Sequence, residues 1–269
     1  MKHHSKTTPC APCNFHLLNI AELPPDLKLT QTLVFDFAGT WAIEVANTHS
    51  FSDVLGVDIN WGMMTHNTRS RYGNLDFAAV DVEEPLPWPR GSFDVIHVKG
   101  LLLEISHYTR LIEKLAMVLR PGGLLAIVEI DPNHVSADGH QLPKCLRQWD
   151  ACVRSALGGR GVDIDFPSRI GSVIANAGVF ASNPYSQYLG VPASSHISRG
   201  DVNSAARSGQ IHHQLLIANL RKTFSALVEY GYNRPDLEDM FSSCLAELTN
   251  PNATYVHRLY AVYATKAYQ

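Results

Sequence analysis

The chain has 269 residues, of which 45% are hydrophobic and 17% are charged, and its formal net charge is −3. This composition excludes intrinsic disorder, which needs low hydrophobicity and a large net charge. It also lacks the strong basic excess that is typical of a general nucleic-acid binder. The length suits one large domain, or a core domain with an insertion.

Residues 1–30 are interrupted by proline and lysine and predict an N-terminal arm. Cys10 and Cys13 form a C-x-x-C pair there, but a metal site would need a second pair of ligands, so we expect no metal. The chain has no apolar run long enough for a membrane span and no secretory signal at its start, which predicts a cytoplasmic location.

In the first half of the chain, short β-rich runs alternate with helical patterns. We expect strands at 32–37, 53–59, 75–80, 93–98 and 124–130, and helices at 40–48, 61–71 and 101–119. Strands that alternate with helices predict the α/β class, with a doubly wound parallel sheet covered by helices on both faces.

After residue 131 the pattern becomes mainly helical. Helices are expected at 143–157, 167–177, 201–230 and 235–248, and strands at 185–191 and 255–265. We therefore expect one domain over residues 31–269, in which helices at about 133–178 and 192–250 form a lid. Long connections of this kind usually carry function as lids or substrate walls.

Acidic residues lie at the ends of several expected strands, and ligands of open α/β sheets bind just beyond these ends. Asp58 ends the second strand, where a carboxylate can accept hydrogen bonds from ribose hydroxyls or cap a helix that begins at Trp61. Asp81 follows the third strand, where it can help to fix an adenine edge or belong to an ordinary loop. Asp36 and Asp131 lie at the ends of the first and fifth strands.

Three segments carry a family resemblance. They are GVDIN (56–60), NLDFAAVDVEEPLPWPRGSFDVIHVKGLL (74–102) and LRPGGLLAIVEID (119–131). In this order and spacing they resemble the class I S-adenosylmethionine-dependent methyltransferases, and are similar to a fungal branch of secondary-metabolism regulators and tailoring enzymes. The resemblance implies a seven-stranded Rossmann-like sheet and S-adenosylmethionine as cofactor. It implies cofactor contacts from Asp36, Gly39, Asp58, Asp81, Val82 and Lys99.

The turn after the first strand departs from the family pattern, in which an acid precedes a series of glycines at alternate positions. Here the chain reads VFDFAGTWAIEVA (34–46), so the turn is about two residues short and keeps only Gly39. Either the tightened turn still admits the cofactor, or Phe37 fills part of the methionine half of the pocket. The second outcome would impair methyl transfer first, because a misplacement of ~1 Å can cost about 100-fold in rate.

The substrate side offers candidate catalytic residues, because some methyl transfers need a general base and histidine suits that role. The candidates are Asp131, His134, His196, His212 and His213. Asp131 can equally be a turn acid before Pro132. His97, inside the fourth strand, is expected to be structural. Four aromatic residues could wall an apolar substrate but are expected in the core: Trp149, Tyr185, Tyr188 and Phe224.

Three functions follow from these patterns. The first is a small-molecule methyltransferase of secondary metabolism that acts on an apolar or weakly polar substrate. The second is an enzyme on the same fold that no longer methylates. It would instead catalyse a pericyclic cyclisation, dehydration or decarboxylation of a polyketide-type intermediate, and the shortened turn favours this alternative. The third is a non-catalytic regulator; for all three, no nucleic-acid partner is expected.

Overall fold

The structure is a computed structural model that describes residues 30–36, 39–59, 72–136, 139–181, 183–192, 202–250 and 255–268. The chain divides into two compact units. The sheet unit takes its described residues from 30–132, 157–189 and 258–268, and the helical unit takes them from 133–156 and 190–257. The expected N-terminal arm and the expected helix at 61–71 lie outside the described residues.

The sheet follows the doubly wound pattern expected from the sequence. Its strands run in the order β3-β2-β1-β4-β5-β8, and β7 also pairs with β8. Pairing is parallel from β3 to β5, whereas β8 is antiparallel to β5. The strands are β1 (Gln31–Asp36), β2 (Asp53–Asp58), β3 (Leu75–Ala79), β4 (Phe93–Lys99), β5 (Leu119–Ile130), β7 (Tyr185–Pro192) and β8 (Tyr255–Thr265).

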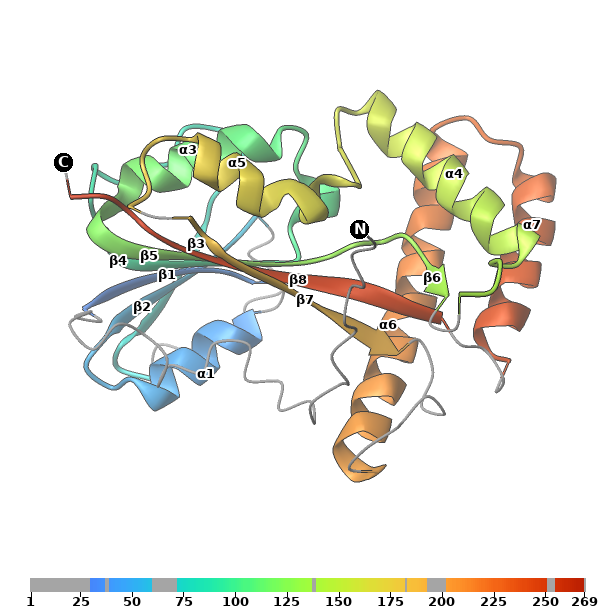
Figure 1. The fold of residues 1–269 in the computed structure, drawn as a ribbon, viewed down its shortest axis with the longest axis horizontal. Helices are drawn as coiled ribbons and strands as arrows, with labels where there is room; N and C mark the ends of the chain where they lie inside the picture. The colour runs from blue at the N-terminus through green and yellow to red at the C-terminus, as the bar shows by residue number, and fades with distance from the viewer. Residues whose placement is uncertain are drawn as a thin grey trace, which may run out of the picture. The chain divides into compact units, whose positions relative to one another are not determined.

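Helices cover both faces of this sheet (Figure 1). On one face lies α1 (Thr40–Thr48), and on the other lie α3 (Tyr108–Val118) and α5 (Ile170–Asn176). Two short 3-10 helices, η4 (Leu102–Glu104) and η5 (Phe166–Arg169), precede α3 and α5 along the chain. The doubly wound α/β fold class is therefore confirmed.

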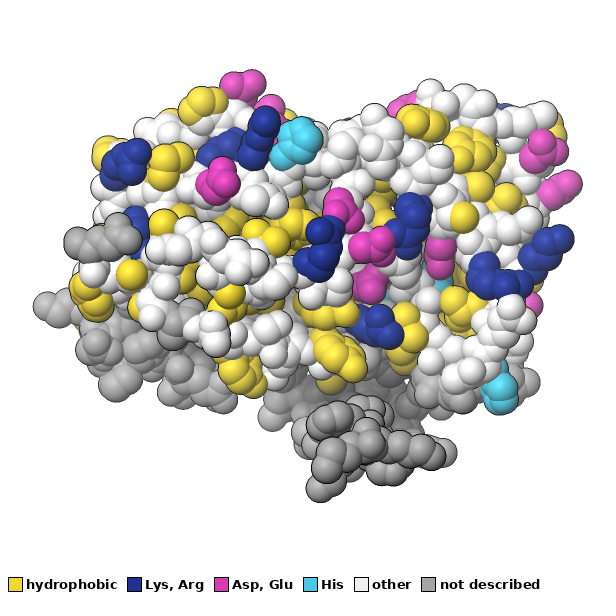
Figure 2. Space-filling model, turned by 45° about the horizontal axis from the view of Figure 1, so that its top comes forward, with side chains coloured by type: hydrophobic (Ala, Val, Ile, Leu, Met, Phe, Trp, Pro, Cys, Tyr) yellow, Lys and Arg dark blue, Asp and Glu magenta, His cyan; other side chains and the backbone are white. Residues whose placement is uncertain are grey.

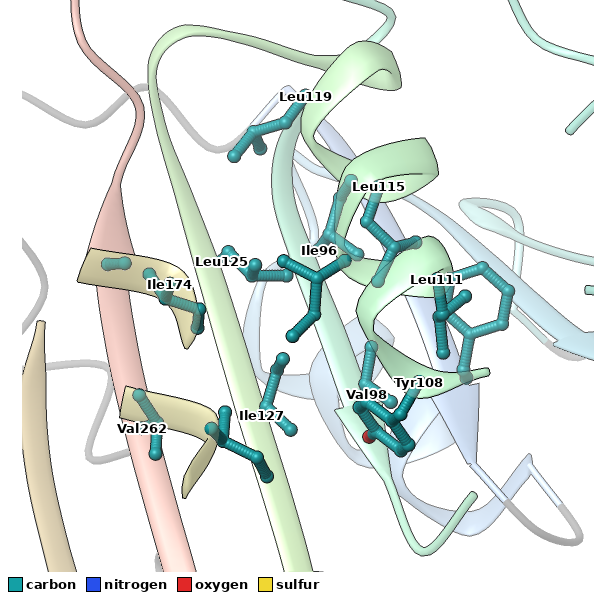
Figure 3. Close-up of a cluster of buried hydrophobic side chains, with 14 of the residues drawn as sticks. Ile96, Val98, Tyr108, Leu111, Leu115, Leu119, Leu125, Ile127, Ile174 and Val262 are labelled. Atoms are coloured by element: carbon teal, nitrogen blue, oxygen red, sulfur yellow. The ribbon is translucent and has the colours of Figure 1, made fainter. Parts of the chain in front are cut away.

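The main core lies between the sheet and α3. Leu111 and Leu115 of α3 pack toward Ile96 of β4 and toward Leu125 and Ile127 of β5, and these side chains are almost completely buried (Figure 3). Residues 93–98 of β4 are all buried, as expected for a parallel strand covered on both faces. This packing makes α3 a rigid element of the sheet unit.

A second core cluster lies under α1. It is formed by Val34, Ala42, Val45, Ala46, Val54 and Leu75, with Phe77 packed against it. Phe77 leaves no space for a side chain at two glycines: a Cβ atom would lie 2.7 Å from its ring at Gly39 and 2.3 Å from it at Gly56. Gly39 also has a φ of 65°, and α1 begins directly after it.

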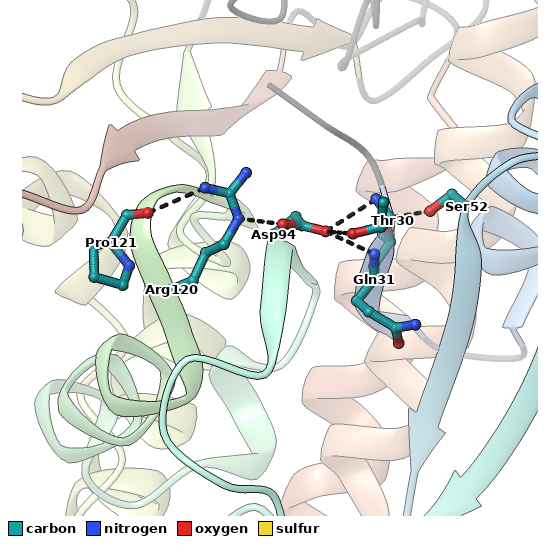
Figure 4. Close-up of polar contacts among 7 residues, drawn as sticks. Thr30, Gln31, Ser52, Asp94, Arg120 and Pro121 are labelled. Atoms are coloured by element: carbon teal, nitrogen blue, oxygen red, sulfur yellow. Dashed lines mark hydrogen bonds and ion pairs between the residues drawn. The ribbon is translucent and has the colours of Figure 1, made fainter. Parts of the chain in front are cut away.

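A polar network connects the amino-terminal ends of β1, β4 and β5 (Figure 4). The carboxylate of Asp94 accepts hydrogen bonds from the backbone amides of Thr30 (2.9 Å) and Gln31 (2.8 Å), from the Thr30 hydroxyl, and from Nε of Arg120. Burial by itself would raise the pKa of Asp94, but these hydrogen bonds outweigh it and lower the pKa. The network joins the starts of β1, β4 and β5, so its role is structural.

The helical unit contains α4 (Lys144–Gly159, which it shares with the sheet unit), α6 (Val202–Glu229) and α7 (Arg234–Leu248). The rings of Trp149 and Phe224 pack against Phe241, with centroids 6.1 and 5.5 Å away. The unit also holds β6 (Val135–Ser136), which pairs with the start of β8 and was not predicted.

Two expected elements differ from the structure. The helix expected over 101–119 is divided into η4 and the shorter α3, because the backbone is extended at Ile105 (φ −109°, ψ 119°). The strand expected from 124 begins at Leu119 instead. Pro121 and the two glycines after it belong to β5, where the Gly122 amide donates to the Lys266 carbonyl (2.9 Å).

Within the described ranges, no helix combines the length and the apolar character that a membrane crossing requires. The face shown in Figure 2 carries Lys and Arg side chains interspersed with Asp and Glu. Charges mixed in this way do not form the basic surface that nucleic acids select.

Candidate cofactor site

The carboxyl ends of neighbouring parallel strands meet at one edge of the sheet unit. In the observed register Asp36 lies beside Lys99, and Asp58 lies beside Ala79 at the end of β3. Asp81 follows two residues after β3 ends. The structure thus brings four of the predicted cofactor contacts to one edge, although only the strand position of Asp36 is described, not its side chain.

Asp58 is the last residue of β2 and is half-buried. Its carbonyl accepts a hydrogen bond from the Val80 amide at 3.2 Å, which joins the end of β2 to the loop after β3. The helix that Asp58 was alternatively expected to cap lies outside the described residues, so that alternative stays a prediction.

Asp81 is exposed and organises its own loop. Its Oδ1 accepts from the Glu83 amide at 2.9 Å, and its carbonyl accepts from the Glu84 amide at 3.2 Å. These are the contacts of an Asx-type turn, so Asp81 has the loop role that the sequence left open. The turn also fixes the position of Val82, the next predicted contact.

Glu129 is a buried acid that was not among the predicted site residues. It lies in β5 with 1% of its surface exposed, and it accepts hydrogen bonds from the Leu101 amide (2.9 Å), the Leu102 amide (3.3 Å) and the Tyr108 hydroxyl (2.6 Å). Burial raises the pKa of Glu129 to about 7, and the three hydrogen bonds oppose that rise. Glu129 therefore holds the connection between β4 and α3 in place.

His97 is a core residue, as the sequence predicted. It is 1% exposed, and its ring stacks on Trp41 of α1 with centroids 3.8 Å apart. Burial, with a smaller contribution from the Lys99 charge, lowers the pKa of His97 to about 3. The ring is therefore neutral at physiological pH and fills space between β4 and α1.

His134 forms a dyad with Asp150 inside the helical unit. Its Nδ1 lies 2.8 Å from Oδ1 of Asp150, and its backbone amide donates to Oδ2 at 3.2 Å. Its Nε2 is buried and has no hydrogen-bond partner among the described residues. The ring packs edge-to-face on His257, with centroids 4.7 Å apart. An imidazole oriented by a carboxylate in this way keeps Nε2 available as a base.

The other catalytic candidates that the structure describes belong to different units. Asp131 is buried in the sheet unit, where its amide donates to the Arg258 carbonyl (2.8 Å), whereas His213 is half-buried on α6 of the helical unit. Of His212 only the helical position is described, and His196 lies outside the described residues. The catalytic assignments therefore stay predictions.

Two expected core aromatics are on the surface instead. Tyr185 and Tyr188 of β7 are 61% and 65% exposed, so that prediction is wrong for them. Both lie on the strand that pairs with β8. Tyr185 stacks on Tyr263 of β8, and the ring of Tyr188 lies tilted against Tyr260 of β8. Trp149, by contrast, is buried as expected.

The donor set fits the adenosine half of a nucleoside cofactor. A carboxylate at the end of β2 can bind ribose hydroxyls, and the ordered turn at Asp81 and Val82 presents backbone groups to an adenine edge. Among the described residues, no group of three or more His, Cys, Asp or Glu side chains could hold a metal ion, and Cys10 and Cys13 lie outside that set.

Comparisons with known proteins find similarity to methyltransferases. Residues 38–123 match the family model of a methyltransferase domain. A protein of Strobilurus tenacellus named methyltransferase str3 is 33% identical over 118 residues, which cover 44% of this chain and 41% of that protein. Residues 38–123 are therefore similar to a methyltransferase domain. The matched segments span only 41% to 52% of the first curated relatives.

Solved structures confirm the Rossmann-like fold. Phosphoethanolamine N-methyltransferase 2 of Haemonchus contortus, in complex with S-adenosyl-L-methionine, has a TM-score of 0.55 at 16% identity, over 93% of this chain and 51% of that chain. The cyclase SpnF has a TM-score of 0.51 at 17% identity, over 89% of this chain and 76% of that chain. One of these neighbours is named a methyltransferase and the other a cyclase, so the fold does not choose between the two reactions.

Proposed function

We propose that this chain binds S-adenosylmethionine at the carboxyl edge of its sheet and transfers the methyl group to a small molecule. The observation that carries the proposal is the alignment of Asp58 with the turn at Asp81 and Val82 at the ends of adjacent strands. A methyltransferase domain match over residues 38–123 supports the same cofactor. An apolar or weakly polar acceptor, a cytoplasmic location and a lid role for the later helices belong to this proposal.

The residues at the edge have separate roles in it. Asp58 accepts hydrogen bonds from the ribose hydroxyls, and the backbone at Asp81 and Val82 orients the adenine. Asp36, Gly39 and Lys99 complete the contacts on the side of β1 and β4. When bound, the cofactor supplies an electrophilic methyl group on a sulfonium, so the protein needs chiefly to hold donor and acceptor in line.

His134, in the helical unit, stays a candidate for the proton-accepting role. Its Nδ1 is engaged by Asp150 at 2.8 Å, which orients the ring and stabilises the imidazolium that proton uptake would form. Its Nε2 is buried and has no hydrogen-bond partner among the described residues. Asp131 is the second candidate for this role.

Isothermal titration with S-adenosylmethionine tests the cofactor proposal. The wild-type chain should bind, and Asp58→Asn should weaken binding by about tenfold or more, because a charge-assisted hydrogen bond to ribose is lost. Asp53→Asn is the matched control, since Asp53 is an exposed acid at the opposite end of the same strand. Absence of wild-type binding at millimolar cofactor would contradict the proposal.

A cyclase-type reaction without methyl transfer is the second candidate function. The shortened turn between β1 and α1, which keeps one glycine, favours it. A product assay separates the two functions. A methylated product formed only with S-adenosylmethionine would support methyl transfer, whereas a cyclised or eliminated product formed equally fast without the cofactor would support the cyclase-type reaction. The regulator function stays a prediction that no described feature favours.

A further inference from the structure

One ammonium group lies against three successive backbone carbonyls beside the candidate cofactor site. Nζ of Lys114, on α3, donates to the carbonyls of Val82 (2.6 Å), Glu83 (2.6 Å) and Glu84 (3.1 Å). The three acceptors belong to the loop that follows β3 and starts at Asp81. All of these groups lie in the sheet unit.

The loop has a second attachment near the start of the same helix. Oε1 of Glu83 accepts a hydrogen bond from the Ser106 amide at 2.6 Å, two residues before α3 begins. The Glu83 amide in turn donates to Oδ1 of Asp81 at 2.9 Å. The turn that carries Asp81 and Val82 is therefore connected to α3 at two points, through Lys114 and through Glu83.

α3 is well suited to hold this loop. Its inner face is buried in the main core through Leu111, Leu115 and Val118, so the helix does not move independently of the sheet. Hydrogen bonds from an ammonium to carbonyls are stronger than neutral ones, and three that converge on one group restrict three peptide planes together. Lys114 thereby fixes the three peptide planes that follow Val82, Glu83 and Glu84.

We infer that Lys114 is a positioning residue for the adenine half of the cofactor site. This inference rests on the proposed function and deepens it. Lys114 acts through the backbone of residues 82–84 rather than by touching the cofactor itself. Its contribution should therefore appear equally for every ligand that carries the adenosine group.

The test compares two ligands and four forms of the protein. S-adenosylmethionine carries both the adenosine and the methionine groups, whereas 5′-methylthioadenosine lacks the amino-acid end. Lys114→Met should weaken both ligands by the same factor, about tenfold. Lys114→Arg should recover part of the affinity, because a guanidinium can donate to the same carbonyls. Arg110→Met is the control, an exposed cation on the same helix that should leave both affinities unchanged.

Two further measurements separate positioning from general damage. Amide exchange at Glu83 and Glu84 should become faster in Lys114→Met, while exchange in β4 and β5 stays as in the wild type. The thermal midpoint identifies a variant that fails to fold, and in that case Lys114→Gln and Lys114→Arg replace Lys114→Met in the ligand comparison.

The outcomes are distinct. Unchanged affinity in a folded Lys114→Met, or a loss confined to S-adenosylmethionine, would overturn the inference while leaving the proposed function intact. A wild-type chain that binds neither ligand would overturn the proposed function and, with it, the role assigned to Lys114. Equal losses for both ligands, with local exchange at the loop, would support the inference.

Discussion

Glu129 is a carboxylate that water cannot reach, and its environment divides into two opposing effects. Burial favours the protonated form, whereas the amides of Leu101 and Leu102 and the hydroxyl of Tyr108 favour the charged form. Burial is the larger effect, so the pKa is raised to about 7. The hydroxyl of Tyr108 is affected in the same direction, since burial and the neighbouring carboxylate raise its pKa.

This shift predicts a pH-dependent stability with a definite sign. The folded state holds the Glu129 proton more tightly than the unfolded state, so wild-type stability should fall as the pH rises from the ordinary value of 4.5 to about 7 and then level off. Glu129→Gln removes this titration. Denaturant unfolding across that pH interval should therefore show a smaller decrease for Glu129→Gln, although its stability is lower throughout. Parallel curves for the two proteins would contradict the assignment.

At the scale of elements, the start of α1 depends on the absence of a side chain. Gly39 has a φ of 65°, and a Cβ atom there would lie 2.7 Å from the Phe77 ring of β3. Gly56 of β2 meets the same ring. One aromatic side chain therefore accounts for two glycines that are far apart in the sequence, and the single glycine kept in the shortened turn has a packing role besides any role toward a cofactor.

Gly39→Ala should destabilise the sheet unit by about 1–3 kcal/mol, because a left-handed backbone and a close contact both penalise the added methyl group. Gly73→Ala is the matched control, since nothing lies within 4 Å of a Cβ atom at that position. Urea unfolding measures both variants. If the contact with the Phe77 ring causes the loss of stability, adding Phe77→Leu to Gly39→Ala should recover part of it. If nothing is recovered, the left-handed backbone at Gly39 is the cause.

At the scale of the whole molecule, the cofactor proposal predicts a change in stability that needs no knowledge of the acceptor. A ligand that binds only the folded state stabilises it by about 2.7 kcal/mol at a hundredfold excess over its Kd. S-adenosylhomocysteine should therefore raise the thermal midpoint of the wild-type chain, and the shift should be much smaller for Asp58→Asn. Equal shifts in the two proteins would show that the ligand binds away from the end of β2.

The fold was largely readable from the order of residues. Continuous apolar runs such as 124–130 and amphipathic spacing such as 108–118 are local patterns, and they predicted most strands and helices within a few residues. The ends of these strands and helices were less predictable where a residue distant in the sequence forms a hydrogen bond with them. The Lys266 carbonyl accepts from the Gly122 amide in β5, and Glu129 accepts from the Leu101 amide at the start of the helix expected over 101–119.

For the candidate site, the sequence by itself determined which acids stand at the strand ends, because motif spacing places Asp58 and Asp81 there in any sheet of this kind. Only the tertiary structure decided which distant side chains contact the loop after Asp81 and the candidate base His134. Lys114 meets its carbonyls across about thirty residues of chain, and Asp150 meets His134 across 16. Tyr185 and Tyr188 were expected in the core but are exposed, because an aromatic strand pattern does not show which face of the strand contacts water. These contacts depend on how the elements pack, and no local periodicity records that.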